Sequence, residues 1–422
     1  MEDAIAQIKR YRQHSASLLL YQEVLHGDAG QAWMLLLDAL IECNEVASAI
    51  AYGQWFSALA AEQQSWQSHL ISQILVADNA FSQQAQHTPL QQLAAALVAG
   101  AQYDLGILQQ LHSLSAERIS QWVTTITHSD QPPSLEFTSK NPSLSFITTP
   151  HWRNAHTELA DYYHTHGVGL FGRFIAFRWQ NAQLTGIPSP DPIQLTQLAA
   201  YDHPKHQLIQ NTESLLRGYT AQNVLLYGSR GAGKSSLVKA LLNEYSAQGL
   251  RLIEVPKADL HNLPLIVEKL AHVPQKFIIF VDDLSFEEDD AAFKALKVVL
   301  EGGVTARPQN VVVYATSNRR HLVREFFDDR PKPKDADEIQ SWDTVQEKLS
   351  FSDRFGLTLT FTPADQPTYL KIVRELAAQA GIKLETEHLE WRARQWATRH
   401  NGRSGRTARQ FVDFLIAEQS ES

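Results

Sequence analysis

Eight consecutive residues carry the most specific chemical signal in this sequence. They fit the pattern G-x-x-x-x-G-K-[ST] and are Gly228, Ser229, Arg230, Gly231, Ala232, Gly233, Lys234 and Ser235. Glycines allow backbone N–H groups to converge on phosphate oxygens at the positive end of a following helix. We expect Lys234 to reach the β- and γ-phosphates of a nucleoside triphosphate and the Ser235 hydroxyl to bind Mg²⁺. We expect Ser236, the next residue, to bind the nucleotide as well.

The surroundings of this glycine-rich pattern support the same interpretation. The apolar run 224–227 precedes it and is typical of a short buried strand. Leu237, Leu241 and Leu242 follow at helical spacing. A strand, a glycine turn and a helix in that order are what a phosphate-binding loop requires.

A pair of acids ends the apolar run 276–281 and forms the second candidate element of the site. We expect Asp282 to hold Mg²⁺ through water and Asp283 to polarise the attacking water, because phosphoryl transfer needs an oriented nucleophile and neutralised charge. The alternative is a pair of acids that simply leaves a strand for solvent. Glu287 or Glu288 is a second candidate for the catalytic base.

Three further polar residues are placed where a nucleotide site could use them. Asn318 ends the next strand at the carboxyl edge of the sheet, where it is expected to position water or contact the γ-phosphate. Arg354 precedes the last strand and could act as an arginine finger in an adjoining subunit, or pair with Asp353 in its own chain. Arg406 follows an apparent helix start and is expected to approach the phosphates. The arginines around it favour nucleotide sensing over DNA binding.

Composition places the chain in a broad class. It has 422 residues, a formal net charge of -9 and a single cysteine, Cys43. The acidic total argues against a protein that coats nucleic acid, and one cysteine excludes an internal disulfide framework. We expect Cys43 to be a buried thiol in a helix. No transmembrane run or secretory signal is evident, so the expected location is cytoplasmic, with no membrane partner.

The patterning of apolar residues predicts four segments. These are a helical N-terminal domain over 1–128, a linker and aromatic docking segment over 129–192, an α/β nucleotide-binding core over 193–362 and a helical lid over 363–422. Tryptophans in the first domain are expected to be core residues rather than base-stacking platforms. The core is expected to hold a five-stranded parallel sheet with flanking helices, because its apolar runs are continuous rather than alternating. The runs lie at 223–227, 252–255, 277–281, 311–315 and 357–361. The charged segment 328–348 is expected to be a surface insertion.

These elements in this order resemble the AAA+ ATPases. Stretches such as NVLLYGSRGAGKSSLVKALLNEY, KFIIFVDDLSFE and SGRTARQF look like one bacterial branch, the AAA+ family catalogued as domain of unknown function 815. The resemblance covers roughly residues 190 to 420. It implies an ATP-binding core with strand order 5-1-4-3-2 and a helical lid, with Lys234, Ser235, Asp282, Asn318, Arg354 and Arg406 in the usual roles of such proteins.

The resemblance also implies an activity and its partners. We expect an Mg²⁺-dependent ATPase, a homo-oligomer that acts as a nucleotide-driven switch or motor on an unknown protein client. Most AAA+ members have Asp-Glu where this chain has Asp282-Asp283, so hydrolysis is expected to be slow or stimulated by a partner. The alternative is a loader-like module that ATP gates and that turns over little. Nucleic acid is a second candidate partner, which the sequence does not favour.

Overall fold

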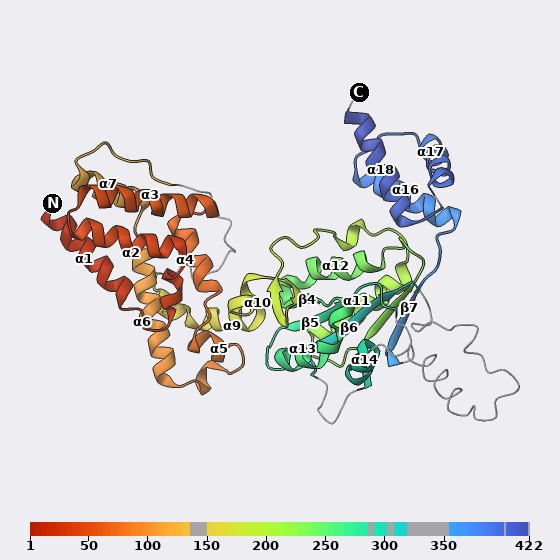
Figure 1. The fold of residues 1–422 in the computed structure, drawn as a ribbon, viewed down its shortest axis with the longest axis horizontal. Coiled ribbons are helices and arrows are strands. Elements are labelled where there is room, and N and C mark those ends of the chain that lie inside the picture. Colours follow the sequence, from red (N-terminus) through yellow and green to blue (C-terminus); the bar gives the residue numbers. More distant parts are fainter. Residues whose placement is uncertain (136–149, 286–290, 302–307, 319–353, 401, 421–422) are drawn as a thin grey trace, which may run out of the picture. The chain divides into compact units, whose positions relative to one another are not determined.

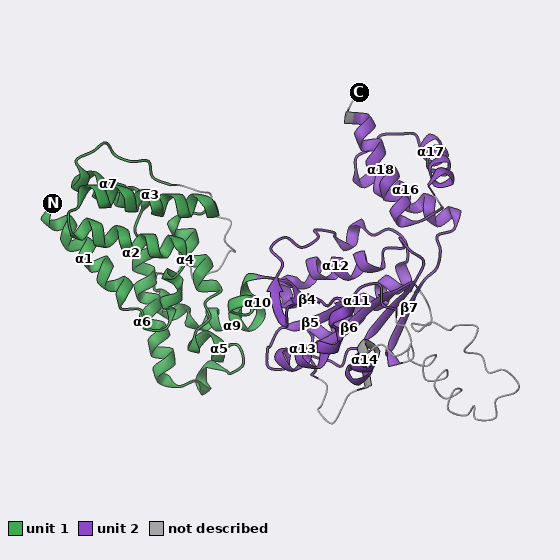
Figure 2. Cartoon of the chain, viewed as in Figure 1, with its two compact units in different colours: residues 1–173 green, residues 174–422 purple. Residues whose placement is uncertain are grey.

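The computed structural model describes residues 1–135, 150–285, 291–301, 308–318, 354–400 and 402–420. The chain divides into two compact units, residues 1–173 and 174–422 (Figure 2). This division falls inside the segment 129–192, for which the sequence suggested a linker and a docking element. The described part of that segment therefore contributes to both units.

The described residues of unit 1 are helical, and their helices pack around one core (Figure 1). The core includes Trp33, Trp55, Trp66 and Trp122, each at most 1% exposed, with three of the rings clustered at centroid distances of 5.0 to 6.2 Å. The prediction that these tryptophans are core residues is confirmed. The helices are α1 (Glu2–Ala16), α2 (Asp28–Ile41), α3 (Glu45–Glu62), α4 (Trp66–Leu75), α5 (Ala80–Ala85), α6 (Ala95–His112), α7 (Ala116–Thr127), α9 (His156–His166) and α10 (Gly169–Arg173).

The expectation of a buried thiol at Cys43 is wrong. Helix α2 ends at Ile41, and Asn44 caps α3 by accepting a hydrogen bond from the N–H of Ala47 at 3.0 Å. This leaves Cys43 in the turn between the helices, where it has a φ of 54° and is exposed. The apolar residues of the helices on either side made this stretch look like one continuous helix, so the short turn was not predicted.

The aromatic residues of the expected docking segment, within 129–192, do not form one element. Trp152 and Tyr163 are buried in the core of unit 1. Phe177 and Trp179 are buried on the first strand of unit 2. These side chains fill the interiors of the two units, which explains their apolar character without a docking role.

Unit 2 contains a seven-stranded sheet in the order β2-β1-β4-β5-β6-β3-β7. All its neighbouring strands are parallel except β1 and β2. The strands β7-β3-β6-β5-β4 reproduce the order 5-1-4-3-2, so the expected AAA+ core is confirmed. The strands are β1 (Ala176–Gln180), β2 (Gln183–Gly186), β3 (Val224–Gly228), β4 (Leu250–Glu254), β5 (Lys276–Val281), β6 (Val311–Ser317) and β7 (Leu357–Phe361).

The two strands β1 and β2 were not expected from the sequence, which predicted five strands. They form an antiparallel hairpin joined by Asn181 and Ala182, with φ of 51° and 57°. Positive φ at both central residues is typical of a tight hairpin turn whose twist matches that of its strands. β1 pairs in parallel with β4, so the hairpin extends the edge of the sheet.

Helices cover both faces of the sheet, and a helical lid follows the last strand (Figure 1). Helix α12 lies on one side of the sheet, and α13 and α14 lie on the other. All seven residues of β6 are buried, which accounts for their continuous apolar pattern. The helices of unit 2 are α11 (Asp202–Leu216), α12 (Lys234–Tyr245), α13 (Leu263–Leu270) and α14 (Ala291–Glu301), and those of the lid are α16 (Gln366–Gln379), α17 (Thr386–Arg399) and α18 (Gly405–Ser420). Among the described residues, no helix has the length and apolar character needed to cross a membrane.

Asp104 is a buried carboxylate of unit 1 that holds the backbone of residues 19–21 in place. It is 0% exposed and accepts hydrogen bonds from the backbone N–H groups of Leu19, Leu20 and Tyr21 at 2.7 to 3.0 Å. Asp104→Ala should lower the free energy of unfolding by about 3 kcal/mol or more, because three N–H groups lose their acceptor. Urea unfolding followed by tryptophan fluorescence measures this loss.

Asp38→Ala is the matched control for this prediction. Asp38 pairs with Arg12 at 2.6 Å but is partly exposed, so its loss should cost less than about 1 kcal/mol. Equal losses in the two variants would contradict the role given to Asp104.

Candidate nucleotide-binding site

The glycine-rich loop connects β3 to α12, and its backbone permits little other than glycine at the first position. Gly228 has a φ of 144°, and a Cβ there would clash with the carbonyl oxygen of Phe361 on β7. The next residue, Ser229, donates its N–H to that same oxygen at 3.1 Å. The start of the loop is therefore fixed against the neighbouring strand.

The rest of the loop turns through two further glycines before the helix begins. Gly231 and Gly233 have φ of 74° and 86°, and α12 starts at Lys234. Left-handed backbone of this kind favours glycine and lets successive N–H groups face one centre. The positive end of the helix dipole adds to this field. The loop therefore has the backbone geometry that the predicted phosphate-binding role requires.

Lys234 is nearly buried in this loop, with 7% of its surface exposed. Its ammonium donates to the carbonyl oxygens of Gly228 and Ser229, both at 2.8 Å, and to Oδ1 of Asn318 at 3.2 Å. Burial lowers the pKa of Lys234, while the nearby carboxylates of Asp282 and Asp283 oppose that shift. The two acids therefore help to keep the lysine charged.

A hydroxyl and a carboxylate meet beside the loop. Ser235 Oγ donates to Asp282 Oδ1 at 2.6 Å, which joins the first turn of α12 to the end of β5. Hard oxygen ligands of these two kinds suit Mg²⁺, which takes one or two protein ligands and completes its shell with water and phosphate. The donor set fits the expected ion. Within the described residues there is no cluster of three or more His, Cys, Asp or Glu side chains suited to a metal.

The second acid of the pair points to the expected amide. Asn318 Nδ2 donates to Asp283 Oδ1 at 2.6 Å. Asp283 itself has a φ of 52°, an uncommon value for a residue other than glycine. Asn318 therefore lies between the ammonium of Lys234 and the carboxylate of Asp283, and contacts both.

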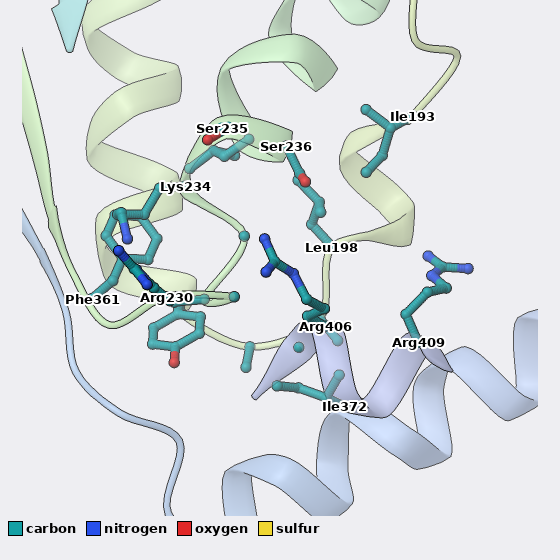
Figure 3. A pocket seen from close by; sticks show the side chains of 18 of the residues that line it. Ile193, Leu198, Arg230, Lys234, Ser235, Ser236, Phe361, Ile372, Arg406 and Arg409 are labelled. Carbon is teal, nitrogen blue, oxygen red and sulfur yellow. The ribbon is translucent and has the colours of Figure 1, made fainter. Parts of the chain in front are cut away.

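The lid reaches the glycine-rich loop at the start of α18. The N–H of Arg406 donates to the carbonyl oxygen of Gly231 at 3.2 Å. Ser404 caps the helix by accepting from the N–H of Thr407 at 3.1 Å. Figure 3 shows the Arg406 side chain extending from the lid toward the loop that carries Lys234. Arg406 therefore lies beside the loop, and its expected approach to the phosphates stays a prediction.

A cavity of about 640 Å³ brings these residues together. The lining includes Arg230, Gly231, Ala232, Gly233, Lys234, Ser235, Ser236, Asp282, Asp283, Asn318 and Arg406. Its volume is in the range of small-molecule sites. Gly228 and Ser229 lie just behind, where their carbonyl oxygens hold the lysine.

The apolar wall of this cavity was not predicted from the sequence, whereas the second arginine that the lid contributes belongs to the C-terminal arginines for which nucleotide sensing was favoured. Ile193, Leu198 and Tyr201 come from the segment before α11, and Ile372 comes from the lid (Figure 3). Arg409 lies one turn after Arg406 and also lines the cavity. The wall forms from segments far apart in the chain, so no local pattern predicts it. The apolar residues ahead of α11 were the one feature of the sequence that pointed to it.

Tyr201 belongs to this wall and also touches the connection to the lid. Its hydroxyl donates to the carbonyl oxygen of Thr362 at 2.7 Å, and its ring lies 5.2 Å from that of Phe361. Burial, and secondarily the charge of Asp365, raise the pKa of Tyr201. The phenol therefore stays protonated and keeps its donor role at neutral pH.

Arg354 is not among the residues that line the cavity of its own chain. It lies just before β7 and is partly buried. The action of Arg354 in a neighbouring subunit stays a prediction. Glu287, Glu288 and the segment 328–348 lie outside the described residues.

The residues that form this cavity all lie in a part of the chain that matches a known protein family. The family described as "Protein of unknown function (DUF815)" matches residues 172–419, which include every residue of the cavity lining. The chain belongs to this family. The match covers unit 2 almost entirely and begins two residues before it.

Individual relatives are more distant. This DUF815 protein is similar to the replication factor C large subunit of Staphylothermus marinus, at 33% identity over 121 residues. The match covers 26% of this chain and 28% of that protein, so the chain spans little more than a quarter of this curated relative.

Solved structures similar to the chain include the RuvB Holliday junction branch migration motor of Thermotoga maritima. The identity is 14%, the match covers 53% of this chain and 72% of that one, and the TM-score is 0.33. A variant of the same RuvB with one substitution gives 16% identity, the same coverage and the same TM-score. A TM-score of 0.33 is too low to support an argument about the site.

Gly405 offers a test of the contact between lid and loop. A Cβ on Gly405 would lie 2.9 Å from the carbonyl oxygen of Gly231. Gly405→Ala should push the start of α18 away from the loop and weaken nucleotide binding roughly tenfold, because small displacements of a binding group are costly. Titration with a fluorescent ATP analogue measures the affinity.

Gly53→Ala provides the matched control, because a Cβ at Gly53 in α3 would meet nothing within 4 Å. That variant should bind the analogue as the wild type does. Unchanged affinity in Gly405→Ala would show that the contact between lid and loop does not contribute to binding.

Proposed function

We propose that this protein binds ATP with Mg²⁺ in the cavity of unit 2 and hydrolyses it to ADP and phosphate. The observation that supports this most directly is the meeting of Lys234, Ser235 and Asp282 at the glycine-rich loop. A cation, a hydroxyl and a carboxylate at the positive end of a helix suit a metal-bound polyphosphate.

In this proposal each residue has a separate task. Loop N–H groups and Lys234 bind the phosphates, and Ser235 and Asp282 would hold Mg²⁺. Bound Mg²⁺ neutralises charge on the β- and γ-phosphate oxygens. Asp283 and Asn318 orient the attacking water, and Arg406 contacts the γ-phosphate side from the lid. Catalysis then comes from positioning and charge, as expected for phosphoryl transfer.

The apolar wall has the character needed for the base. Ile193, Leu198 and Ile372 line the cavity together with the ring of Tyr201. A planar purine gains from burial against such side chains, and polar groups elsewhere in the cavity bind the phosphates. We therefore assign this wall to the adenine of ATP.

The proposal extends to an assembly. Arg354 would enter the cavity of an adjoining copy and offset charge on the γ-phosphoryl group, which makes the protein a homo-oligomer. Unit 1 would recruit a protein client to this nucleotide-driven switch or motor. The cytoplasmic location expected from the sequence stays a prediction.

A second candidate function is a loader-like module in which ATP acts as a gate with little turnover. It is favoured by the bond between Asp283 and Asn318, which engages the catalytic carboxylate within the chain. Turnover measured with and without single- or double-stranded DNA discriminates the two, because loading onto DNA predicts stimulation that falls with salt. No stimulation would favour the ATPase acting on a protein client.

Lys234→Ala should weaken ATP binding roughly 100-fold or more, because a charged contact to the phosphates is lost. Equilibrium titration with ATP in magnesium buffer measures this effect. Lys383→Ala, at an exposed lysine of the lid, should bind as the wild type does. Binding by Lys234→Ala within threefold of the wild type would exclude the assigned phosphate site.

Arg354→Ala should leave ATP affinity unchanged and lower turnover at least about 100-fold in the assembled protein, since a finger acts on the transition state. Steady-state phosphate release at several protein concentrations measures this, and the wild type should lose turnover on dilution. Arg118→Ala in unit 1 is the control. Wild-type turnover of the Arg354 variant in an assembled oligomer would refute the finger.

A further inference from the structure

One side chain at the end of β6 contacts both members of the acid pair. Thr316 is 2% exposed, and its hydroxyl donates to Asp282 Oδ1. The same hydroxyl oxygen accepts the backbone N–H of Asp283 at 2.9 Å. Thr316 is thus the bridge between the strand that ends in Asn318 and the strand that ends in the two acids.

At Asp282, the contact restricts a carboxylate that has another partner. Oδ1 of Asp282 accepts from both Thr316 and Ser235, which approach from β6 and from α12. Two donors on one oxygen fix the rotation of the carboxylate. They also leave Oδ2 free of any protein hydrogen bond that the structure records among described residues.

At Asp283, the contact stabilises an unusual backbone. A φ of 52° is costly for a residue other than glycine, although aspartate tolerates it better than most. The N–H of Asp283 bonds to the Thr316 side chain, and the N–H of Leu284 bonds to the Thr316 carbonyl oxygen at 2.7 Å. These two bonds hold the turn that directs the Asp283 carboxylate to Asn318.

We propose that Thr316 is a positioning residue for the metal and the catalytic water, which acts by orienting Asp282 and Asp283 together. This inference rests on the proposed ATPase function. Thr316 lines the cavity beside the two acids, and the effect proposed for it acts through their carboxylates. It sets the direction of one carboxylate through a side-chain bond and of the other through the backbone.

If residue 316 only had to pack in the strand, a hydroxyl would not be needed there. β6 is buried along its whole length, and valine has the shape and strand preference that packing there requires. Val312 and Val313 occupy the same strand. The hydroxyl is therefore the part of Thr316 that packing does not explain, and Thr316→Val removes it while keeping the shape.

The experiment compares Thr316→Val with Thr316→Ser, which keeps the hydroxyl. Thr316→Val should bind ATP in the absence of divalent cations as the wild type does. It should need roughly tenfold more Mg²⁺ for half-maximal tightening of ATP binding, and its turnover should fall at least about tenfold. Thr316→Ser should restore both. Mn²⁺ binding in the presence of ADP, followed by electron paramagnetic resonance, gives a readout independent of turnover.

Thr212→Val is the matched control. Thr212 is 0% exposed and lies in α11, outside the cavity lining. Its hydroxyl donates to the carbonyl oxygen of Leu208 at 2.8 Å and also shares a hydrogen bond with the hydroxyl of Tyr314 on β6 at 3.0 Å. This variant loses an equally buried hydroxyl and should keep the wild-type Mg²⁺ dependence and turnover per folded molecule. Thermal melting of each variant shows how much is folded, and Thr316→Ala, which also removes the hydroxyl, carries the test if the valine variant does not fold.

Three results would overturn the inference. One is Thr316→Val with wild-type Mg²⁺ dependence and turnover. Another is equal weakening of ATP binding with and without Mg²⁺, which indicates a general distortion of the site. The third is a serine variant that folds but resembles valine. A wild type that fails to bind ATP in magnesium buffer would instead refute the proposed function, and is recognised before any variant is made.

Discussion

The site depends on one buried ammonium group whose three protons are all engaged. Lys234 donates to two carbonyl oxygens of its own loop and to the amide oxygen of Asn318. A buried charge is costly unless it is paired and hydrogen-bonded, so the loop, β6 and the acids must all be in place around it. The ends of β3, α12 and β6 meet at this cation, and each supplies a group of the hydrogen-bonded site.

The same arrangement links a ligand on the lysine to the second acid. The bond from Lys234 to Asn318, at 3.2 Å, is the longest of its three, so an anion that competes for the ammonium displaces it most readily. Asn318 also donates to Asp283, at 2.6 Å. A phosphate that took over the lysine would therefore free the amide oxygen of Asn318, and the side chain that holds Asp283 would change its own partners.

Local patterns predicted the parts of the site that depend on few neighbouring residues. The glycine loop, the acids and five strands follow from sequence spacing, because each is set by backbone geometry or by continuous burial. The β1–β2 hairpin was not predicted, because its aromatic residues were interpreted as part of a docking segment. Thr316 and the apolar wall could not be found, since Thr316 meets the acids only through the register of Val281 with Ala315, and the wall joins Ile193 to Ile372.

Tyr201 connects the cavity to the segment that leads into the lid. Ala200 and Tyr201 both have left-handed backbone, at φ of 65° and 59°, which costs about 1 to 3 kcal/mol each. Contacts must hold them there, and one of these is the phenol bond to Thr362, in the connection between β7 and the lid. The residue that lines the cavity therefore also contacts the connection between β7 and the lid. Under the proposed function, a base that packed on Tyr201 would stabilise the strained turn and, through the bond to Thr362, the lid orientation seen here.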